Sequence, residues 1–406
     1  MKKLLLTMVL CLSVALVFGQ KKAVSEVKRE IGNANPNYQD AKSLISEAKV
    51  NPETKDNAET WFVAGKVEYR QFDLERTKET LELAPDFPEM YMSLINILPN
   101  FIVADSLDML PNEKGKVKPK FRKDMKSIML ANRSSYIRGG AFFLDNKDFI
   151  TAYKFFQQYI DIPNLNMFAG ENLAANDTLY SQIKFYAAYS LFQIGGDSQR
   201  TIAAFQNIKN GGYLENDIYR ILCAEYEQLN DTVNLVKTLK EGFEKFPNEQ
   251  YYLLNLIDQY FYANQNDEAI AYLERAIAIR PNDAQLYDFL GKVYENKNDI
   301  SNAQANFEKA LSIDPDYVEA IGDLGRIFFN QAAEAQTAAN EIADNKKYEA
   351  ARSEANEMFK KSLPFFEQAH QMKPDDRSYM NVLSRIYYIL NMGDKFDEIE
   401  KALGNQ

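Results

Sequence analysis

The chain has 406 residues, with 47 Lys and Arg against 58 Asp and Glu, one His and two Cys. A single imidazole and two thiols exclude a multi-histidine metal site, a cysteine-rich zinc site and a disulfide scaffold. The formal net charge of −11 argues against a general nucleic-acid binder, because phosphate neutralisation needs a clustered excess of Lys and Arg. A hydrophobic fraction of 46%, with few Gly and Pro, indicates a globular and mainly helical chain.

The first residues have the pattern of a secretory signal peptide, which we expect to span residues 1–19. Lys2 and Lys3 form a short positive region, and the run from Leu4 to Phe18 is almost entirely apolar. A membrane-anchoring helix is the alternative, but about 15 apolar residues fall short of the roughly 20 that span a bilayer. Cys11 lies in the middle of the run without a lipobox, so a lipoprotein is disfavoured.

Removal of the signal peptide leaves Cys223 as the one thiol, so the mature chain has no intramolecular disulfide. No later segment approaches 18 uninterrupted apolar residues, and we therefore expect no transmembrane segment in the mature chain. The protein should therefore be exported, and periplasmic or secreted.

Two helical regions are expected next. Residues 20–56 show two helix-like patterns and should form an N-terminal helical cap. Residues 57–110 should form helices of a degenerate repeat, because Trp61-x2-Ala64-Gly65 followed by Leu81, Ala84 and Pro85 weakly matches a pattern that recurs downstream.

Residues 111–132 are expected to form a basic strap followed by a helix. From Pro111 to Lys126 there are seven basic residues and two acidic ones, with Lys alternating with Gly, Val, Pro and Phe. Such alternation is typical of an extended surface segment. It is either a solvated loop that docks on the acidic body of the same protein or a site for an anionic polymer or lipid headgroup, and the net charge favours the first.

A 34-residue period governs the centre of the chain. Pro247, Pro281 and Pro315 are 34 residues apart, and each follows an apolar helical stretch. Between the last two, the sequence reads Tyr287-x2-Leu290-Gly291-x2-Tyr294-x8-Ala303-x3-Phe307-x2-Ala310-x4-Pro315. Sliding this frame predicts four in-phase repeats over residues 182–317, and an out-of-phase repeat with an insertion over 133–181.

This pattern resembles the tetratricopeptide repeat at every position except Tyr in place of Trp. The resemblance implies an all-α, right-handed superhelical solenoid of antiparallel helix pairs. Small residues such as Gly65 and Gly291 should lie where two helices approach closely, and Tyr and Phe should fill the space between neighbouring pairs.

The period breaks in residues 318–376, where the next helix-ending proline, Pro374, comes about 25 residues late. The extra sequence from Gln331 to Asn356 is rich in Ala, Glu and Lys and has no Gly or Pro. We expect one elongated helical hairpin there, projecting between about Asn330 and Glu357, either as a solvated spacer or as a docking arm. Residues 377–406 should form a C-terminal capping repeat.

No catalytic or cofactor motif stands out. His370 is the only imidazole and lies in a helical pattern, and the Gly-Lys pairs are followed by Val where a phosphate loop needs Ser or Thr. We expect no enzyme activity, no cofactor and no metal site.

The resemblance implies that a ligand lies along the first helices of the pairs. Slots that clamp a chaperone's C-terminal carboxylate in related repeats hold Tyr186 and Ser190, or Arg220 and Ala224, so that pattern is missing. The candidate groove residues are Tyr186, Asp217, Arg220, Tyr251, Leu254, Asp258, Phe261, Tyr262, Asp288, Lys292, Arg326 and Phe329.

The sequence therefore predicts a non-enzymatic exported scaffold or adaptor that binds a protein or peptide through the groove, the hairpin or both. The signal peptide and the repeats resemble those of exported repeat proteins of gram-negative bacteria, and this resemblance implies a role in the cell envelope. The alternative is a glycan-binding outer-membrane uptake component of helical-repeat type. Such proteins normally carry a lipobox and several exposed Trp, and here Trp61 is the only tryptophan.

Overall fold

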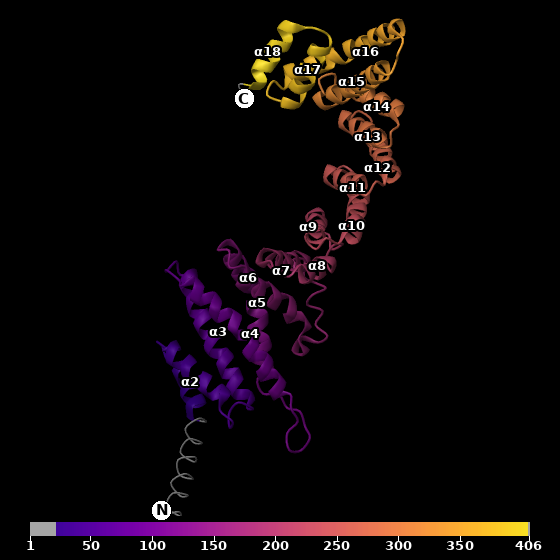
Figure 1. Cartoon of the computed structure of the whole chain (residues 1–406). Helices are drawn as coiled ribbons and strands as arrows, with labels where there is room; N and C mark the ends of the chain where they lie inside the picture. Colours follow the sequence, from indigo (N-terminus) through magenta and orange to yellow (C-terminus); the bar gives the residue numbers. More distant parts are fainter. Residues whose placement is uncertain (1–21, 405–406) are drawn as a thin grey trace, which may run out of the picture. The chain divides into compact units, whose positions relative to one another are not determined.

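The computed structural model describes residues 22–404, and over that range the chain is helical with no strand. The predicted signal peptide and Cys11 lie outside the described residues. The chain divides into two compact units, residues 1–230 and 231–406, and the boundary falls inside the stretch expected to hold four in-phase repeats. An all-α fold built from helix pairs is confirmed within each unit (Figure 1).

The first unit begins with a helical segment at residues 22–30 and continues through helices of very different length. Its elements are α2 (Tyr38–Val50), α3 (Ala58–Thr80), α4 (Phe87–Asp108), α5 (Arg122–Asp145), α6 (Phe149–Asp161), the 3₁₀ turns η1 (Ile162–Asn164) and η2 (Asn166–Phe168), α7 (Tyr180–Ile194), α8 (Ser198–Gln206) and α9 (Glu215–Gln228).

The repeat pattern expected between Trp61 and Pro85 is only half right. The α3 helix runs on without a break to Thr80, so Leu81 and Pro85 lie in the linker before α4 instead of closing a second helix. Gly65 nevertheless marks a close approach, because a Cβ there would lie 2.3 Å from the ring of Phe101 on α4. The partner of α3 is thus a helix further along the chain than the frame placed it.

The basic strap is shorter than expected and is anchored at its end. Residues 110–121 are not helical, whereas Arg122 already begins α5. The carboxylate of Asp108 accepts backbone N–H bonds from Lys120 and Phe121 at 2.9 and 2.8 Å, and Arg122 forms a bidentate pair with Asp105. The loop extends beyond the ends of α4 and α5 (Figure 1) with residues 112–120 all exposed.

Within the described residues one helix, α4, is long and apolar enough to cross a membrane by length and composition alone. Most of that stretch is buried within the first unit, where Leu94 and Phe101 are fully covered. A core helix passes the same test, so the absence of a transmembrane segment stays a prediction.

The second unit is more regular. Its helices are α10 (Thr232–Lys245), α11 (Gln250–Tyr262), α12 (Asn266–Ile279), α13 (Ala284–Asn296), α14 (Ile300–Ile313), α15 (Val318–Asn340), α16 (Asn345–Met372), α17 (Arg377–Ile389) and α18 (Gly393–Gly404). Each period proline, Pro247, Pro281 and Pro315, comes two residues after a helix ends, as expected. Asn264 and Asn298, also 34 residues apart, adopt left-handed conformations with φ of 54° and 61° in the turns inside two pairs, because Asn tolerates that region.

The elongated hairpin is confirmed. The helices α15 and α16 have 23 and 28 residues and pack side by side, with a short turn at residues 341–344 (Figure 1). Ala332, Ala339 and Ala355 are fully buried along the hairpin, so small side chains allow the two helices to approach closely. At its base Phe329, Phe359 and Phe366 join the core shared with α17 and α18.

Candidate binding groove

A hollow of about 540 Å³ lies across the first helices of three successive pairs in the second unit. Ile257, Asp258 and Phe261 of α11 form one wall, α13 contributes Phe289 and Lys292 among others, and α15 contributes Arg326. Its surface is mainly apolar, and charged groups stand at its edge. Phe261 is 40% exposed although it is a large aromatic ring, so this wall is open to a ligand.

A second hollow of about 410 Å³ adjoins the first. It is lined by α15, by Phe366 of α16 and by Tyr379 and Val382 of α17. Lys292 and Arg326 belong to both hollows. The two are therefore adjacent, and we call the surface that they occupy over α11, α13, α15 and α17 the α11–α17 groove.

The floor of the groove is an alternating network of charges. Lys292 Nζ lies 2.6 Å from Asp288 Oδ2 and 3.2 Å from Asp323 Oδ2. Arg326 lies 2.7 Å from Asp323 Oδ1 and also pairs with Glu295. The network links two successive first helices, so it fixes the position of each cation and holds neighbouring repeats in register.

Burial shifts the titration of this network. Asp288 is fully buried, and its desolvation raises its pKa to about 6 although Lys292 opposes the shift. Burial alone would lower the pKa of Lys292, but its two carboxylate partners outweigh that effect and raise it. Asp258 is exposed, but the atoms around it desolvate it enough to raise its pKa, and no cation offsets that effect.

Five predicted groove residues line the two hollows: Asp258, Phe261, Lys292, Arg326 and Phe329. Asp288 lies beneath them as a buried member of the charge network. Tyr251, Leu254 and Tyr262 are also on α11 but line neither hollow. Tyr251 and Leu254 are half-buried, and Tyr262 is exposed.

The three remaining predicted residues belong to the first unit, and the groove includes none of them. Asp217 and Arg220 are exposed on α9. Tyr186 on α7 is a packing residue, since its ring stacks on Phe156 at 5.7 Å and its hydroxyl lies 3.2 Å from that of Tyr213.

Sequence reasoning missed Phe289, Glu295 and Asp323, of which the 34-residue frame points to Glu295 alone. Asp258, Lys292 and Arg326 occupy the same slot of successive repeats. Glu295 falls in the same slot as Phe261 and Phe329, and Asp323 in that of Phe289. Taking every residue of the predicted slots would have added Glu295, but not Phe289 or Asp323, whose slot held no predicted residue.

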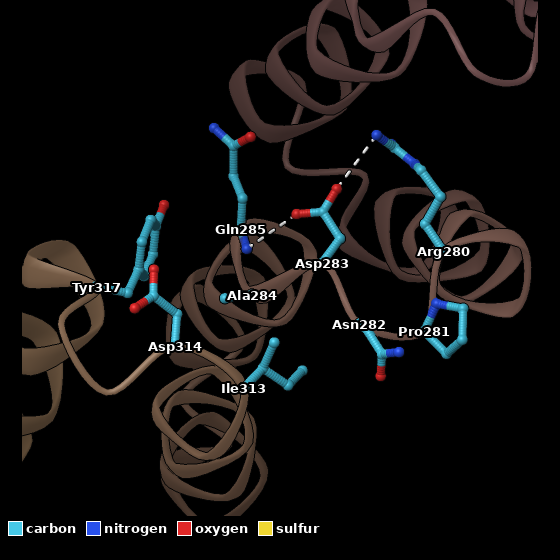
Figure 2. A pocket seen from close by; sticks show the side chains of 9 residues that line it. All are labelled: Arg280, Pro281, Asn282, Asp283, Ala284, Gln285, Ile313, Asp314 and Tyr317. Carbon is cyan, nitrogen blue, oxygen red and sulfur yellow. Dashed lines mark hydrogen bonds and ion pairs between the residues drawn. The ribbon is translucent and has the colours of Figure 1, made fainter.

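Another hollow, of about 580 Å³, is formed by the turns between repeats (Figure 2). Asp283 occupies its centre, pairing with Arg280 at 3.1 Å and accepting the Gln285 backbone N–H at 3.2 Å (Figure 2). Asp283 is the N-cap of α13. Its role is thus already explained by the start of the helix, and we assign binding to the groove instead.

The described residues contain no group of three or more His, Cys, Asp or Glu side chains placed to hold a metal ion. His370 lies half-buried in the last turn of α16, where a basic residue suits the helix dipole, and Cys223 is buried in α9.

Comparison with known proteins identifies the repeats. The family described as tetratricopeptide repeat matches residues 260–283 and 284–317, which include Phe261 of the groove wall and all of α13 and α14. No curated protein matches the chain.

Several solved structures are similar at low identity. The crystal structure of MamA protein is 20% identical with a TM-score of 0.33, covering 48% of this chain and 96% of that one. YrrB, described as a TPR protein with an unusual peptide-binding site, is 15% identical with a TM-score of 0.32, covering 48% and 94%. A monomeric IFIT1 mutant with Gppp-AAAA is 15% identical with a TM-score of 0.37, covering 83% and 68%. At these scores no functional conclusion follows from the likeness.

The chain therefore contains tetratricopeptide repeats, as the sequence pattern predicted. Repeats of this kind support a role as a protein-interaction scaffold.

Proposed function

We propose that the protein is a non-enzymatic scaffold, exported to the cell envelope, that binds an extended segment of a partner protein in the α11–α17 groove. The observation that carries the proposal is the succession of two adjacent hollows over four first helices, with exposed aromatic surface beside a fixed charge network. Apolar anchors surrounded by charge are how protein interfaces concentrate binding energy.

Export rests on the sequence of residues 1–19 alone. Its test is the N-terminus of the protein isolated from fractionated cells, determined by mass spectrometry. A chain beginning near Gln20 in a periplasmic or extracellular fraction supports export, whereas an intact Met1 in the cytoplasmic fraction contradicts it.

The glycan-binding alternative gains no support from Trp61, the one tryptophan of the sequence. Trp61 is half-buried, its Nε1 donates to the backbone carbonyl of Lys55 at 2.7 Å, and Lys49 Nζ lies 4.7 Å from its ring centre. An indole engaged on both its edge and its face is a poor platform for a sugar ring.

The groove is tested by cross-linking the mature protein in an envelope extract and identifying the captured protein. The test variant carries Phe261→Ala and Tyr262→Ala, which remove rings that are 40% and 83% exposed and so leave the core intact. A matched control is Ile279→Ala, an apolar side chain of similar exposure on the second helix of the same pair. One partner lost only from the test variant supports the groove, and equal capture by all three proteins contradicts it.

The hairpin is tested in the same assay by a variant that replaces Gln331–Asn356 with a short linker. Loss of the partner from this variant alone would assign binding to the hairpin.

A further inference from the structure

The two cations of the groove are already committed to partners within the fold. Lys292 serves two carboxylates and Arg326 serves two, with Asp323 shared between them. The network therefore contains three carboxylates and two cations, so it keeps a net negative charge. An anionic ligand would compete with these carboxylates for either cation and would meet a net negative charge, so the network favours a cationic ligand.

Asp258 adds an exposed carboxylate that pairs with no cation of the fold. It lies on the wall of the first hollow beside Ile257 and Phe261. Among the described residues it has no ion-pair or hydrogen-bond partner. The surrounding atoms desolvate it enough to raise its pKa, and no neighbouring cation opposes that shift. A cation brought by a ligand would supply the missing partner.

The surface next to Asp258 suits the rest of such a ligand. Phe261 is 40% exposed and Phe289 half-buried in the same hollow. The stem of a Lys or Arg side chain can pack on these rings while its charged end reaches the carboxylate, and an aromatic face attracts the cation itself. Phe329, Tyr379 and Val382 offer apolar contacts further along.

The length of the groove favours an extended chain. Packed helices lie about 9 Å apart, so a path over four first helices is about 27 Å long. An extended segment rises about 3.3 Å per residue, and about eight or nine residues cover that path.

We propose that the α11–α17 groove receives an extended segment of a partner protein in which a Lys or Arg is flanked by apolar residues, with the cationic group paired to Asp258. This inference rests on the proposed function, because it names the chemistry of the partner for the same groove.

The test measures binding of a library of blocked, uncharged-terminus peptides of about nine residues to the full mature chain by calorimetry. The flanking residues are varied among apolar side chains, and the central residue is Lys, norleucine or Glu. We expect the tightest binders to have Lys, the weakest to have Glu, and the preference for Lys to decline at high salt.

Two variants locate the effect. Asp258→Asn should weaken binding of Lys peptides about 2- to 5-fold and leave norleucine peptides unchanged, as expected for an ion pair at an exposed carboxylate. The control is Glu274→Gln, an exposed carboxylate on α12 that loses the same charge outside the groove, and it should change neither.

The outcomes separate the two proposals. Suppose that Phe261→Ala abolishes peptide binding while Glu peptides bind as well as Lys peptides, or while Asp258→Asn changes nothing. In either case the proposal of a basic segment is wrong, and the groove remains the binding surface. If no peptide binds, the groove itself is wrong as the working surface.

The strap has the same chemistry as the proposed ligand, since Lys alternates with small and apolar residues from Lys114 to Lys120. The strap of a second copy of this chain occupies the groove if the protein forms a dimer and the double substitution Lys116→Ala, Lys118→Ala prevents dimer formation. Sedimentation of the wild type and of this double variant decides the point, and a strap-dependent dimer would overturn the proposal of a separate partner.

Discussion

Gly291 sits where helix propensity and packing make opposite predictions for Gly291→Ala. In an exposed helix interior, replacing Gly with Ala stabilises by about 1 kcal/mol. At this position a new Cβ would lie 2.6, 2.8 and 2.9 Å from three ring carbons of Phe307. Phe307 is fully buried, so its ring has no free space into which to move.

Packing should win. Forcing an extra carbon into a filled core costs typically about 1–3 kcal/mol, and three contacts below 3.0 Å indicate the upper part of that range. Subtracting the gain in helix propensity leaves a net destabilisation of about 2 kcal/mol. Long repeat arrays need not unfold in one step, so the assay is native-state hydrogen exchange followed over α13 and α14.

Two further variants make the reasoning refutable. Gly393→Ala is the matched control, because a Cβ at the start of α18 meets no atom within 4 Å and should be neutral or slightly stabilising. Phe307→Leu should relieve part of the clash, so the double variant should lose less stability than the sum of the two single losses. Stabilisation by Gly291→Ala equal to that of Gly393→Ala would refute the steric account.

Three other predictions concern the charge network, the strap and the thiol. The pKa of Asp288 is raised to about 6 in the folded state, so the folded state binds this proton more tightly than the unfolded state. The contribution of Asp288 to stability should therefore be largest near pH 4 and decline as the pH rises through 6. Asp288→Asn should therefore flatten the pH dependence of hydrogen exchange in α13 between pH 4 and 7, and a wild type with the same slope as the variant would contradict this. Trypsin should cut the native protein first in the exposed strap, between Lys114 and Lys120. Asp108→Ala should speed that cleavage several-fold, because it releases the backbone N–H groups that anchor the strap. First cleavage elsewhere would show that the anchor is misplaced. Cys223 is fully buried and should react with a thiol reagent only as fast as the chain unfolds, so immediate labelling of the native protein would disprove its burial.

The sequence predicted the second unit well because its repeats obey one local rule. A proline two residues after each second helix and a small residue facing an aromatic ring recur at fixed spacing, and both have a direct steric cause. The hairpin could be predicted from the same period, because the extra residues from Gln331 to Asn356 include no Gly or Pro.

The first unit was harder to predict because long-range packing decides it. Gly65 was correctly read as a point of close approach, but its partner Phe101 comes from a helix that the repeat frame does not contain. The strap's end depends on Asp105 and Asp108, acidic side chains that no local pattern distinguishes from solvated ones.

The groove was half predicted for a related reason. Slots in the repeat frame identify which residues face the first-helix surface, and Asp258, Lys292 and Arg326 were found in this way. Whether a charged residue is committed within the fold or available to a ligand depends on its neighbours in adjacent repeats. The two cations, Lys292 and Arg326, pair with Asp323 and Glu295 respectively, and only the structure shows that these side chains are close to one another.

The central claim is that the first-helix groove of the second unit contacts the partner, and site-specific photo-cross-linking in intact cells tests it most directly. A benzoylphenylalanine placed at Phe289, in the groove, should form one discrete protein adduct. The same group at Ala305, exposed on the second helix α14, should form none. Adducts from Ala305 and none from Phe289 would contradict the account.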